Sequence, residues 1–354
     1  MGKLIRPSRR AVLAGAASLG IAKAAPFIIS RPAAAQARTL FVNTWGGVWT
    51  TAQEAAFFKP FTEMTGIRIR TVAPVSAAKL RAQVQSRNYE WDVTGINEPE
   101  WLRADNEGYA EPIDYSIVNK DKLPPNAVFA NGIANCVLST NLCYRKDKFP
   151  NGGPQNWADF WDVKKFPGNR AMYHSAARSM AFALVADGVP LDKVYPMDVD
   201  RALRKLDEIK PHIKVWWKEG TQSQQLIRDG EVDMLPLWNA RSSDLIAQGV
   251  PVEIVWHGGV AYRTMWGVVK GAPNKDIAWR FLEFTAQARP QAEFSRRVFY
   301  GPINPDALQY LPEELVRQMP SYEPNARQLV KTDAAWEAAN LATMQERFLE
   351  WLAK

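Results

Sequence analysis

The sequence has few of the residues and none of the local motifs that usually carry catalysis. It contains two cysteines and three histidines in 354 residues. No Gly-x-x-x-x-Gly-Lys phosphate loop, His-Glu-x-x-His zinc motif, Cys-x-x-Cys pair or Gly-x-Ser-x-Gly nucleophile elbow occurs. His174, His212 and His257 are scattered along the chain, so we predict neither a metal site nor a cofactor.

A run of about 18 uninterrupted apolar residues, the least that spans a bilayer, is also missing at the N-terminus. Ser8-Arg9-Arg10 instead leads into an apolar stretch, residues 11–29, that Lys23 and Pro26 interrupt. Ala35-Gln36-Ala37 then supplies the small-x-small pattern of a signal peptidase site. We therefore predict a twin-arginine signal peptide, residues 1–37, and a periplasmic mature protein.

An excess of positive charge is absent from the predicted mature chain. The whole sequence carries a net charge of +7, but residues 1–37 hold six basic residues and no acid. Their removal leaves about +1, which gives no support to a nucleic-acid or anionic-membrane partner.

After the leader, predicted strands alternate with predicted helices in two regions. The first has strands at 39–43, 67–71 and 92–96, with helices from Thr51, capped by that residue, to Gly66, then 77–86 and 98–106. The second has strands at 170–173, 213–217 and 231–236 and helices at 176–186, 199–209 and 221–228, before a strand at 265–269 and a helix at 276–286. This alternation predicts an α/β protein with parallel strands and a ligand cleft at their carboxyl ends.

The two cysteines flank a segment that is typical of a turn. Cys136 and Cys143 lie on either side of Ser139-Thr140-Asn141, which predicts two strands joined by a hairpin. A disulfide across that hairpin is possible in an oxidising compartment, and two buried thiols fit the sequence equally well.

Several short motifs occur in a characteristic order over some 250 residues. They are Thr44-Trp45, the helix end 61–66 (FTEMTG), 157–168 (WADFWDVKKFPG), 186–190 (ADGVP), 229–231 (DGE), Trp238-Asn239, 270–275 (KGAPNK) and 300–302 (YGP). In this order the chain resembles the periplasmic spermidine/putrescine-binding proteins of bacterial ABC importers. The resemblance implies two lobes, 38–140 with 260–308 and 141–259, joined by crossing strands, with C-terminal helices at 309–354. This is the type II periplasmic binding protein fold, which closes on one ligand and docks on an inner-membrane permease.

The resemblance also implies which residues line the cleft. The aromatic residues that clamp a ligand in that family correspond to Trp45, with Trp49 nearby, Trp238 and Tyr300. The polyamine-binding acids do not match, because their positions hold Ser175 and Arg178, and about Met265 on the returning strand. A buried ammonium without a carboxylate partner costs several kcal/mol, so the cleft is a poor polyamine site.

Arginines suggest a different ligand. Arg178, Arg241 and Arg263 are predicted near the cleft, and a guanidinium grips a carboxylate bidentately. Glu337 or Asp244 is available for an amine, and Asn97, Ser175 and Asn239 complete the predicted ligand-binding residues. We expect a small amine- or carboxylate-bearing solute, with an ω-amino acid favoured over spermidine or putrescine.

Two other functions remain open at this stage. The first is an exported enzyme on the same fold, because twin-arginine export carries folded proteins and often cofactor enzymes. The second is a sensory binding protein that reports its ligand to a receptor. The favoured prediction is a monomeric binding protein of an ABC importer that binds no nucleic acid.

Overall fold

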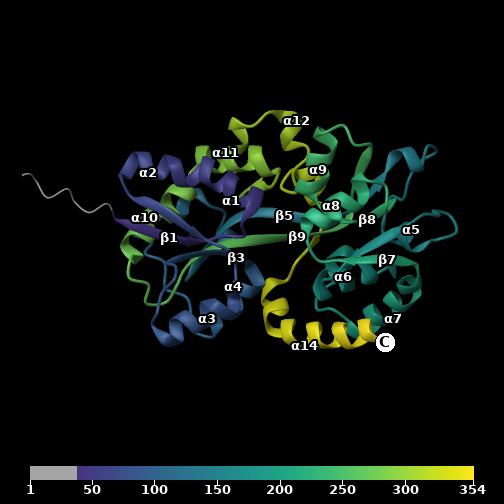
Figure 1. Cartoon of the computed structure of the whole chain (residues 1–354), viewed down its shortest axis with the longest axis horizontal. Coiled ribbons are helices and arrows are strands. Elements are labelled where there is room, and N and C mark those ends of the chain that lie inside the picture. The colour runs from purple at the N-terminus through teal and green to yellow at the C-terminus, as the bar shows by residue number, and fades with distance from the viewer. Residues whose placement is uncertain (1–37) are drawn as a thin grey trace, which may run out of the picture. The chain divides into compact units, whose positions relative to one another are not determined.

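One mixed sheet organises residues 38–354, the part of the chain that this computed structural model describes (Figure 1). The predicted signal peptide, 1–37, lies outside the described residues. The main strands are β1 (Thr39–Asn43), β2 (Arg68–Val72), β3 (Val93–Asn97), β5 (Gly132–Arg145), β6 (Arg170–Tyr173), β7 (Ile213–Trp217), β8 (Met234–Trp238) and β9 (Val252–Val268). Their order is β2-β1-β3-β9-β5-β8-β6-β7. Three short strands complete the sheet: β4 (Val128–Phe129), β10 (Gly301–Pro302) and β11 (Val330–Lys331).

The sheet has two parallel ends and an antiparallel middle. β1 runs parallel to β2 and β3 at one end, and β6 runs parallel to β7 and β8 at the other. β5 and β9 pair antiparallel along almost their whole length. β9 also pairs with β3, and β5 with β8, so these two long strands connect the two ends of the sheet.

The first half packs helices on both sides of its strands. After β1 come α1 (Gly47–Gln53), a π-helical turn (Glu54–Phe58) and α2 (Lys59–Thr65), followed by α3 (Ala77–Ser86), α4 (Glu98–Asn106), α10 (Lys275–Thr285) and α11 (Ala288–Val298). α2 and α11 lie on one side and α3 and α4 on the other (Figure 1). Large aromatic side chains, among them Phe57, Trp101, Trp266 and Phe281, form its core.

The second half repeats this arrangement. Its helices are α5 (Trp157–Trp161), α6 (Ala176–Ala186), α7 (Val199–Ile209), α8 (Gly220–Arg228) and α9 (Asn239–Ala247). α8 and α9 lie on one side of the strands, and α6 and α7 on the other (Figure 1). Its hydrophobic clusters are separate from that of the first half.

The C-terminal segment contacts both halves. It contains α12 (Glu313–Val316), α13 (Glu323–Ala326) and the long α14 (Ala334–Ala353). α14 packs against α4 of the first half and α6 of the second, and runs along the lower edge of Figure 1. In residues 38–354 no helix combines the length and apolar character needed to cross a bilayer.

The predicted hairpin between the cysteines is wrong. Ser139, Thr140 and Asn141 are fully buried in the middle of the continuous strand β5. The side chains of Ser139 and Asn141 bond inside the sheet, where Ser139 Oγ donates to Asn141 Oδ1 at 2.5 Å. Both thiols are free, and seven residues of extended strand separate them by about 23 Å, far beyond disulfide reach.

The predicted cap at Thr51 is also wrong. The helix begins at Gly47, four residues earlier, and Thr51 Oγ1 donates back to the Gly47 carbonyl at 3.3 Å. Gly46 and Gly47 have φ angles of 88° and 55°, which residues with a side chain rarely adopt. The glycine pair can therefore turn the chain sharply into α1. Trp49 therefore lies on the first turn of the helix, close behind the end of β1.

Candidate functional site

Strand β5 brings three aromatic positions together from distant parts of the chain. Trp238, at the end of β8, pairs with Thr140, and Tyr262 of β9 pairs with Leu138. Tyr300 directly precedes Gly301, which pairs with Val137. Because neighbouring strands lie about 4.8 Å apart, these rings gather around a short stretch of β5 where the two halves meet.

The aromatic residues form one group in each half. In the second half, Tyr173 stacks on Trp217 at 4.0 Å between ring centroids, and Trp238 meets both edge-on at 6.0 and 5.8 Å. In the first half, Trp49 packs against Tyr300 at 5.6 Å and against Phe294 at 5.2 Å. Trp45, predicted as a clamp, is 37% exposed.

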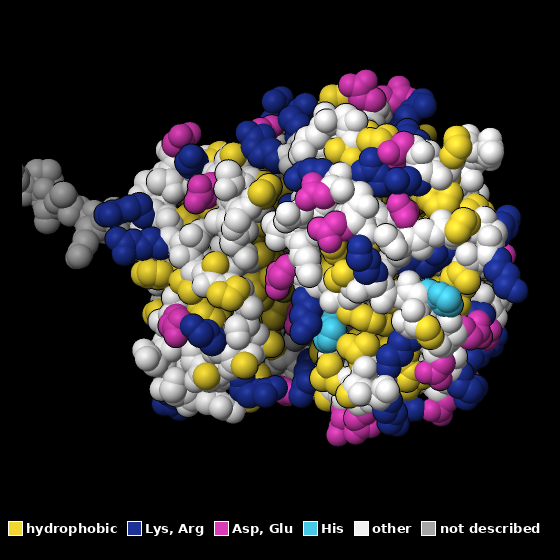
Figure 2. Space-filling view, turned by 45° about the vertical axis from the view of Figure 1, so that its right-hand side comes forward, with side chains coloured by type: hydrophobic (Ala, Val, Ile, Leu, Met, Phe, Trp, Pro, Cys, Tyr) yellow, Lys and Arg dark blue, Asp and Glu magenta, His cyan; other side chains and the backbone are white. Residues whose placement is uncertain are grey.

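The surface between the halves is hollowed. Figure 2 shows a furrow down this face, with hydrophobic side chains inside it. Trp49, Asn97, Tyr173, Trp238 and Tyr262 are all only partly buried, unlike the rings of the two cores. The indole nitrogens of Trp49 and Trp238 have no hydrogen-bond partner among the described residues, and a buried donor left unpaired costs about 1–3 kcal/mol.

Arg178 is held in a buried network. Its Nη2 contacts Glu337 Oε2 at 2.8 Å, its Nη1 donates to Thr332 Oγ1 at 3.0 Å, and its guanidinium lies 4.7 Å from the centre of the Tyr262 ring. The Tyr195 hydroxyl contacts the other oxygen of Glu337. Burial by itself lowers the pKa of Arg178, but the Glu337 carboxylate and the neighbouring Tyr195, Tyr262 and Tyr173 together more than offset this, so the pKa is raised and the guanidinium stays charged.

Arg263 lies in a different environment. It grips Glu98 bidentately, with Nε to Oε2 at 2.8 Å and Nη2 to Oε1 at 2.5 Å, and Nη1 donates to the Asn126 carbonyl. Tyr262 and Arg263 are consecutive in β9, so their side chains leave opposite faces of the strand. The Glu98–Arg263 pair lines a cavity of about 410 Å³, to which Tyr262 and residues of the segment 320–332 also contribute.

Other predicted site residues have structural contacts. Asn239 accepts from the Ser139 backbone and donates to the Phe299 carbonyl, at 3.1 and 2.8 Å, and so ties the two halves together. Ser175 is the N-cap residue of α6, although its hydroxyl makes no capping bond. Asp244, weighed as an amine partner, accepts from Gln224 at 2.5 Å.

Two remaining predicted residues have few partners. Arg241, in the first turn of α9, donates to Gln224 Oε1 at 3.1 Å. Asn97, at the end of β3, donates to Glu100 Oε2 at 2.9 Å. Gly220 leaves room for the side chains above it, because a Cβ there would come within 2.5 Å of Trp238 and 3.2 Å of Arg241 Nε.

Sequence reasoning missed Tyr173, Tyr262, Tyr195 and Glu100. Tyr173 ends β6 just as Trp238 ends β8, so the strand-end rule that found Trp238 also applies to it. Nothing local distinguishes the other three, because their places depend on strand register and on the packing of α14.

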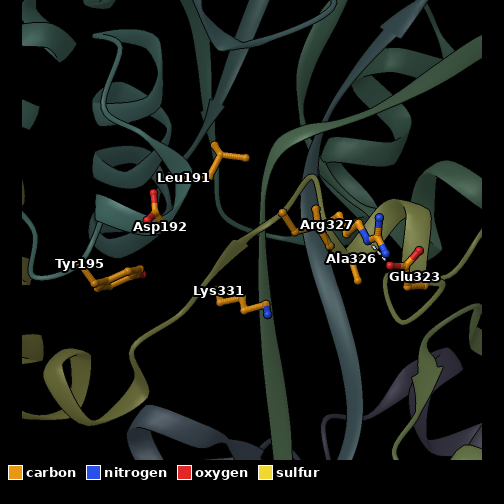
Figure 3. Close-up of a pocket in the computed structure, with 8 residues that line it drawn as sticks. Leu191, Asp192, Tyr195, Glu323, Ala326, Arg327 and Lys331 are labelled. Atoms are coloured by element: carbon orange, nitrogen blue, oxygen red, sulfur yellow. Dashed lines mark ion pairs between the residues drawn. The ribbon is translucent and has the colours of Figure 1, made fainter.

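A second cavity, of about 660 Å³, adjoins the Arg178 network, because Tyr195 contacts Glu337 and also lines this cavity. Figure 3 shows Asp192 and Tyr195 on one side, Glu323 and Arg327 paired on the other, and Lys331 between them. No group of three or more His, Cys, Asp or Glu within residues 38–354 is arranged to hold a metal ion.

Comparison with known proteins identifies the family. Residues 56–323 match the model of the bacterial extracellular solute-binding proteins. The gamma-aminobutyric acid-binding protein of Pseudomonas aeruginosa is 35% identical over 331 residues, covering 91% of this chain and 93% of that protein. The spermidine/putrescine-binding periplasmic protein of Escherichia coli is 21% identical over 328 residues, covering 89% of both.

A solved structure agrees with these relatives. An ABC transporter substrate-binding protein from Bradyrhizobium japonicum superposes with a TM-score of 0.85 at 35% identity, covering 89% of this chain and 99% of that one. The predicted two-lobed α/β fold and the predicted family are thereby confirmed, and an enzyme is excluded. The chain belongs to the bacterial extracellular solute-binding proteins, whose task is to bind a solute rather than to transform it.

Proposed function

We propose that this protein captures a small solute carrying both an amine and a carboxylate, such as an ω-amino acid, and delivers it to an ABC permease in the inner membrane. The observation that carries the proposal is that each half places an aromatic group beside the crossing strands, with Arg241, which has no carboxylate partner in the described residues, next to Trp238. A relative that binds gamma-aminobutyric acid shares 35% of the sequence, which supports this ligand class.

Polyamines fit the same cleft poorly. Arg178 adds a buried positive charge beside Tyr262, and Glu337, the acid nearest to it, is already neutralised by that arginine. A polyamine brings at least two cations, and each one that is buried needs a carboxylate of its own to offset a desolvation of several kcal/mol per ion. An amino acid brings its own negative charge and avoids this penalty.

The proposed mechanism is closure of two lobes on the ligand. We place the lobes at 38–140 with 260–308 and at 141–259, and the separate hydrophobic clusters of the two halves support this division. The lobes move about β5 and β9, and the ligand selects the closed state because it contacts both lobes only there. Export by the twin-arginine route and a monomeric state complete the proposal.

A ligand panel tests the function directly. The chain 38–354 is titrated with 4-aminobutyrate and its shorter and longer homologues, putrescine, spermidine and glutarate, and unfolding is followed by heat. A ligand at 100 times its Kd stabilises by about 2.7 kcal/mol, which gives a clear rise in Tm. We expect the largest rise with an ω-amino acid, and a rise with the polyamines alone contradicts the proposal.

A matched pair of tryptophan variants separates binding from stability. Trp238→Ala removes the ring that meets Tyr173 and Trp217, so we expect it to abolish the ligand-induced rise. Trp216→Ala removes a tryptophan that packs instead on Phe348 and Trp351 of α14. This control should lower the Tm but keep the response to ligand, and an equal response in both variants contradicts a cleft at Trp238.

A further inference from the structure

The charged side chains around the cleft fall into two classes. Arg178 and Arg263 each have a carboxylate partner within the chain, Glu337 and Glu98. Arg241 makes only one amide contact, with Gln224, and no carboxylate lies within ion-pair distance of it in the described residues. Its charge is therefore not neutralised by the protein.

Arg241 nevertheless has a defined position. It lies on the first turn of α9, three residues after Trp238, and both side chains pass close to Gly220, where a Cβ would come within 2.5 Å of Trp238 and 3.2 Å of Arg241 Nε. The positive N-terminal end of α9 adds to the attraction for an anion at this place. Trp238 and Arg241 thus offer an apolar wall and a bidentate donor side by side.

Glu100 is the corresponding unpaired acid in the first half. It lies on the first turn of α4, where only the Asn97 amide donates to it, at 2.9 Å. No Lys or Arg forms an ion pair with Glu100 among residues 38–354, although Glu100 is partly buried. Burial raises the pKa of Glu100, and the Asn97 hydrogen bond only partly opposes this.

The tyrosines of the cleft connect the two unpaired groups. Burial is the main cause that raises the pKa of Tyr173, and the charge of Glu100 adds to it. Burial likewise raises the pKa of Tyr300, while the positive charge of Arg241 opposes it and the neighbouring Tyr173 adds to it. The strand pairing gives the same arrangement: Asn97 pairs with Thr264 of β9 and Trp238 with Thr140 of β5, so Glu100 and Arg241 follow strand ends on either side of the two crossing strands.

We propose that Glu100 binds the ammonium group and Arg241 the carboxylate of a zwitterionic ligand whose methylene chain lies between the aromatic groups. The inference rests on the proposed function and names the groups that select its ligand. It assigns one pole to each lobe, so that only a ligand with both charges completes both ion pairs. Such a ligand holds the lobes closed, whereas a monoamine or a monocarboxylate engages one lobe alone.

The test compares one zwitterion with its two half-charged analogues. The chain 38–354 and its variants are titrated by calorimetry with 4-aminobutyrate, with butyrate, which lacks the ammonium, and with butylamine, which lacks the carboxylate. Glu100→Gln should weaken 4-aminobutyrate binding about 10- to 100-fold and remove its advantage over butyrate. Arg241→Gln should produce a loss of the same order and remove the advantage over butylamine.

Exposed residues supply the controls. Glu63→Gln on α2 and Arg204→Gln on α7 change the same charges away from the cleft and should bind as the wild type does. Unliganded Tm values verify that each variant is folded.

The possible failures are distinguishable. If the wild type binds 4-aminobutyrate or a homologue and a variant binds equally well, that pole is wrong while the proposed function stands. If the wild type binds no ω-amino acid from 3-aminopropanoate to 6-aminohexanoate, the proposed function fails and this inference with it.

Discussion

Arg178 and Arg241 belong to the same half of the protein and follow strands of the same sheet, but their surroundings differ. The Arg178 side chain is 8% exposed and its charge is matched by Glu337, which is 2% exposed. Arg241 is more accessible and contacts only an amide. A fully buried charge has to be neutralised by the protein itself, whereas a charge at the cleft wall can be left for a ligand to neutralise.

The same contrast separates the two acids. Glu337 is surrounded by the Arg178 guanidinium and the Tyr195 hydroxyl, which link α14 to the second half. Glu100 has one amide neighbour and a raised pKa. We interpret Arg178 and Glu337 as a structural link, and Arg241 and Glu100 as the binding groups.

Glu337→Gln should have the largest effect. The variant leaves Arg178 buried without a counter-charge, and breaking a buried ion pair in this way costs about 3–5 kcal/mol. We expect the urea midpoint at pH 7 to fall sharply, with the free energy of unfolding measured by tryptophan fluorescence.

A double variant provides the control for this prediction. Arg178→Met with Glu337→Leu removes both charges and leaves apolar side chains of similar size, so it should recover most of the lost stability. An unfolding curve of Glu337→Gln that coincides with the wild type would mean that water reaches Arg178, contrary to its burial.

Glu100→Gln should act in the opposite direction and by less. A raised pKa means that the folded protein binds the proton more tightly than the unfolded chain, so stability is lost as the pH rises through the folded pKa of Glu100. Removing the charge should therefore raise the free energy of unfolding at pH 7 and flatten its decline above about pH 4, where the unfolded chain loses this proton. A variant that is less stable than the wild type at pH 7 contradicts an unpaired acid.

Local sequence patterns predicted most of the fold. Helices 77–86, 98–106, 176–186 and 199–209 were placed at their observed bounds, because apolar spacing and adjacent turns mark them clearly. The predicted hairpin at 139–141 is wrong because Ser, Thr and Asn favour turns in general, yet here the side chains of Ser139 and Asn141 bond inside a strand buried on both faces.

The candidate site was less accessible to sequence reasoning. Strand ends direct attention to Trp238, and the family resemblance to Arg241, and their binding of a ligand stays a prediction. The partners of the other charges lie far away in the chain. Glu337 is 159 positions from Arg178, and Glu98 is 165 positions from Arg263. Whether an arginine is neutralised depends on such long-range contacts, which residue type and spacing do not encode.

The two cysteines allow the two halves to be compared by thiol labelling, and we expect their chemistry to have the smallest effect on stability. Cys136 lies in the core of the first half and Cys143 in that of the second, and burial raises the pKa of each thiol to about 12. Since only the thiolate reacts readily, neither should be labelled by a maleimide at pH 7.5 in the folded protein, and reductant should leave the Tm unchanged.

Labelling of single-cysteine variants, Cys136→Ala and Cys143→Ala, can then report each half separately. In the Glu337→Gln background, low urea should expose Cys143 before Cys136, because the broken ion pair anchors α14 to the second half. Equal labelling rates would instead mean that the two halves open as one unit, and that the Arg178 network stabilises the whole protein rather than its own half.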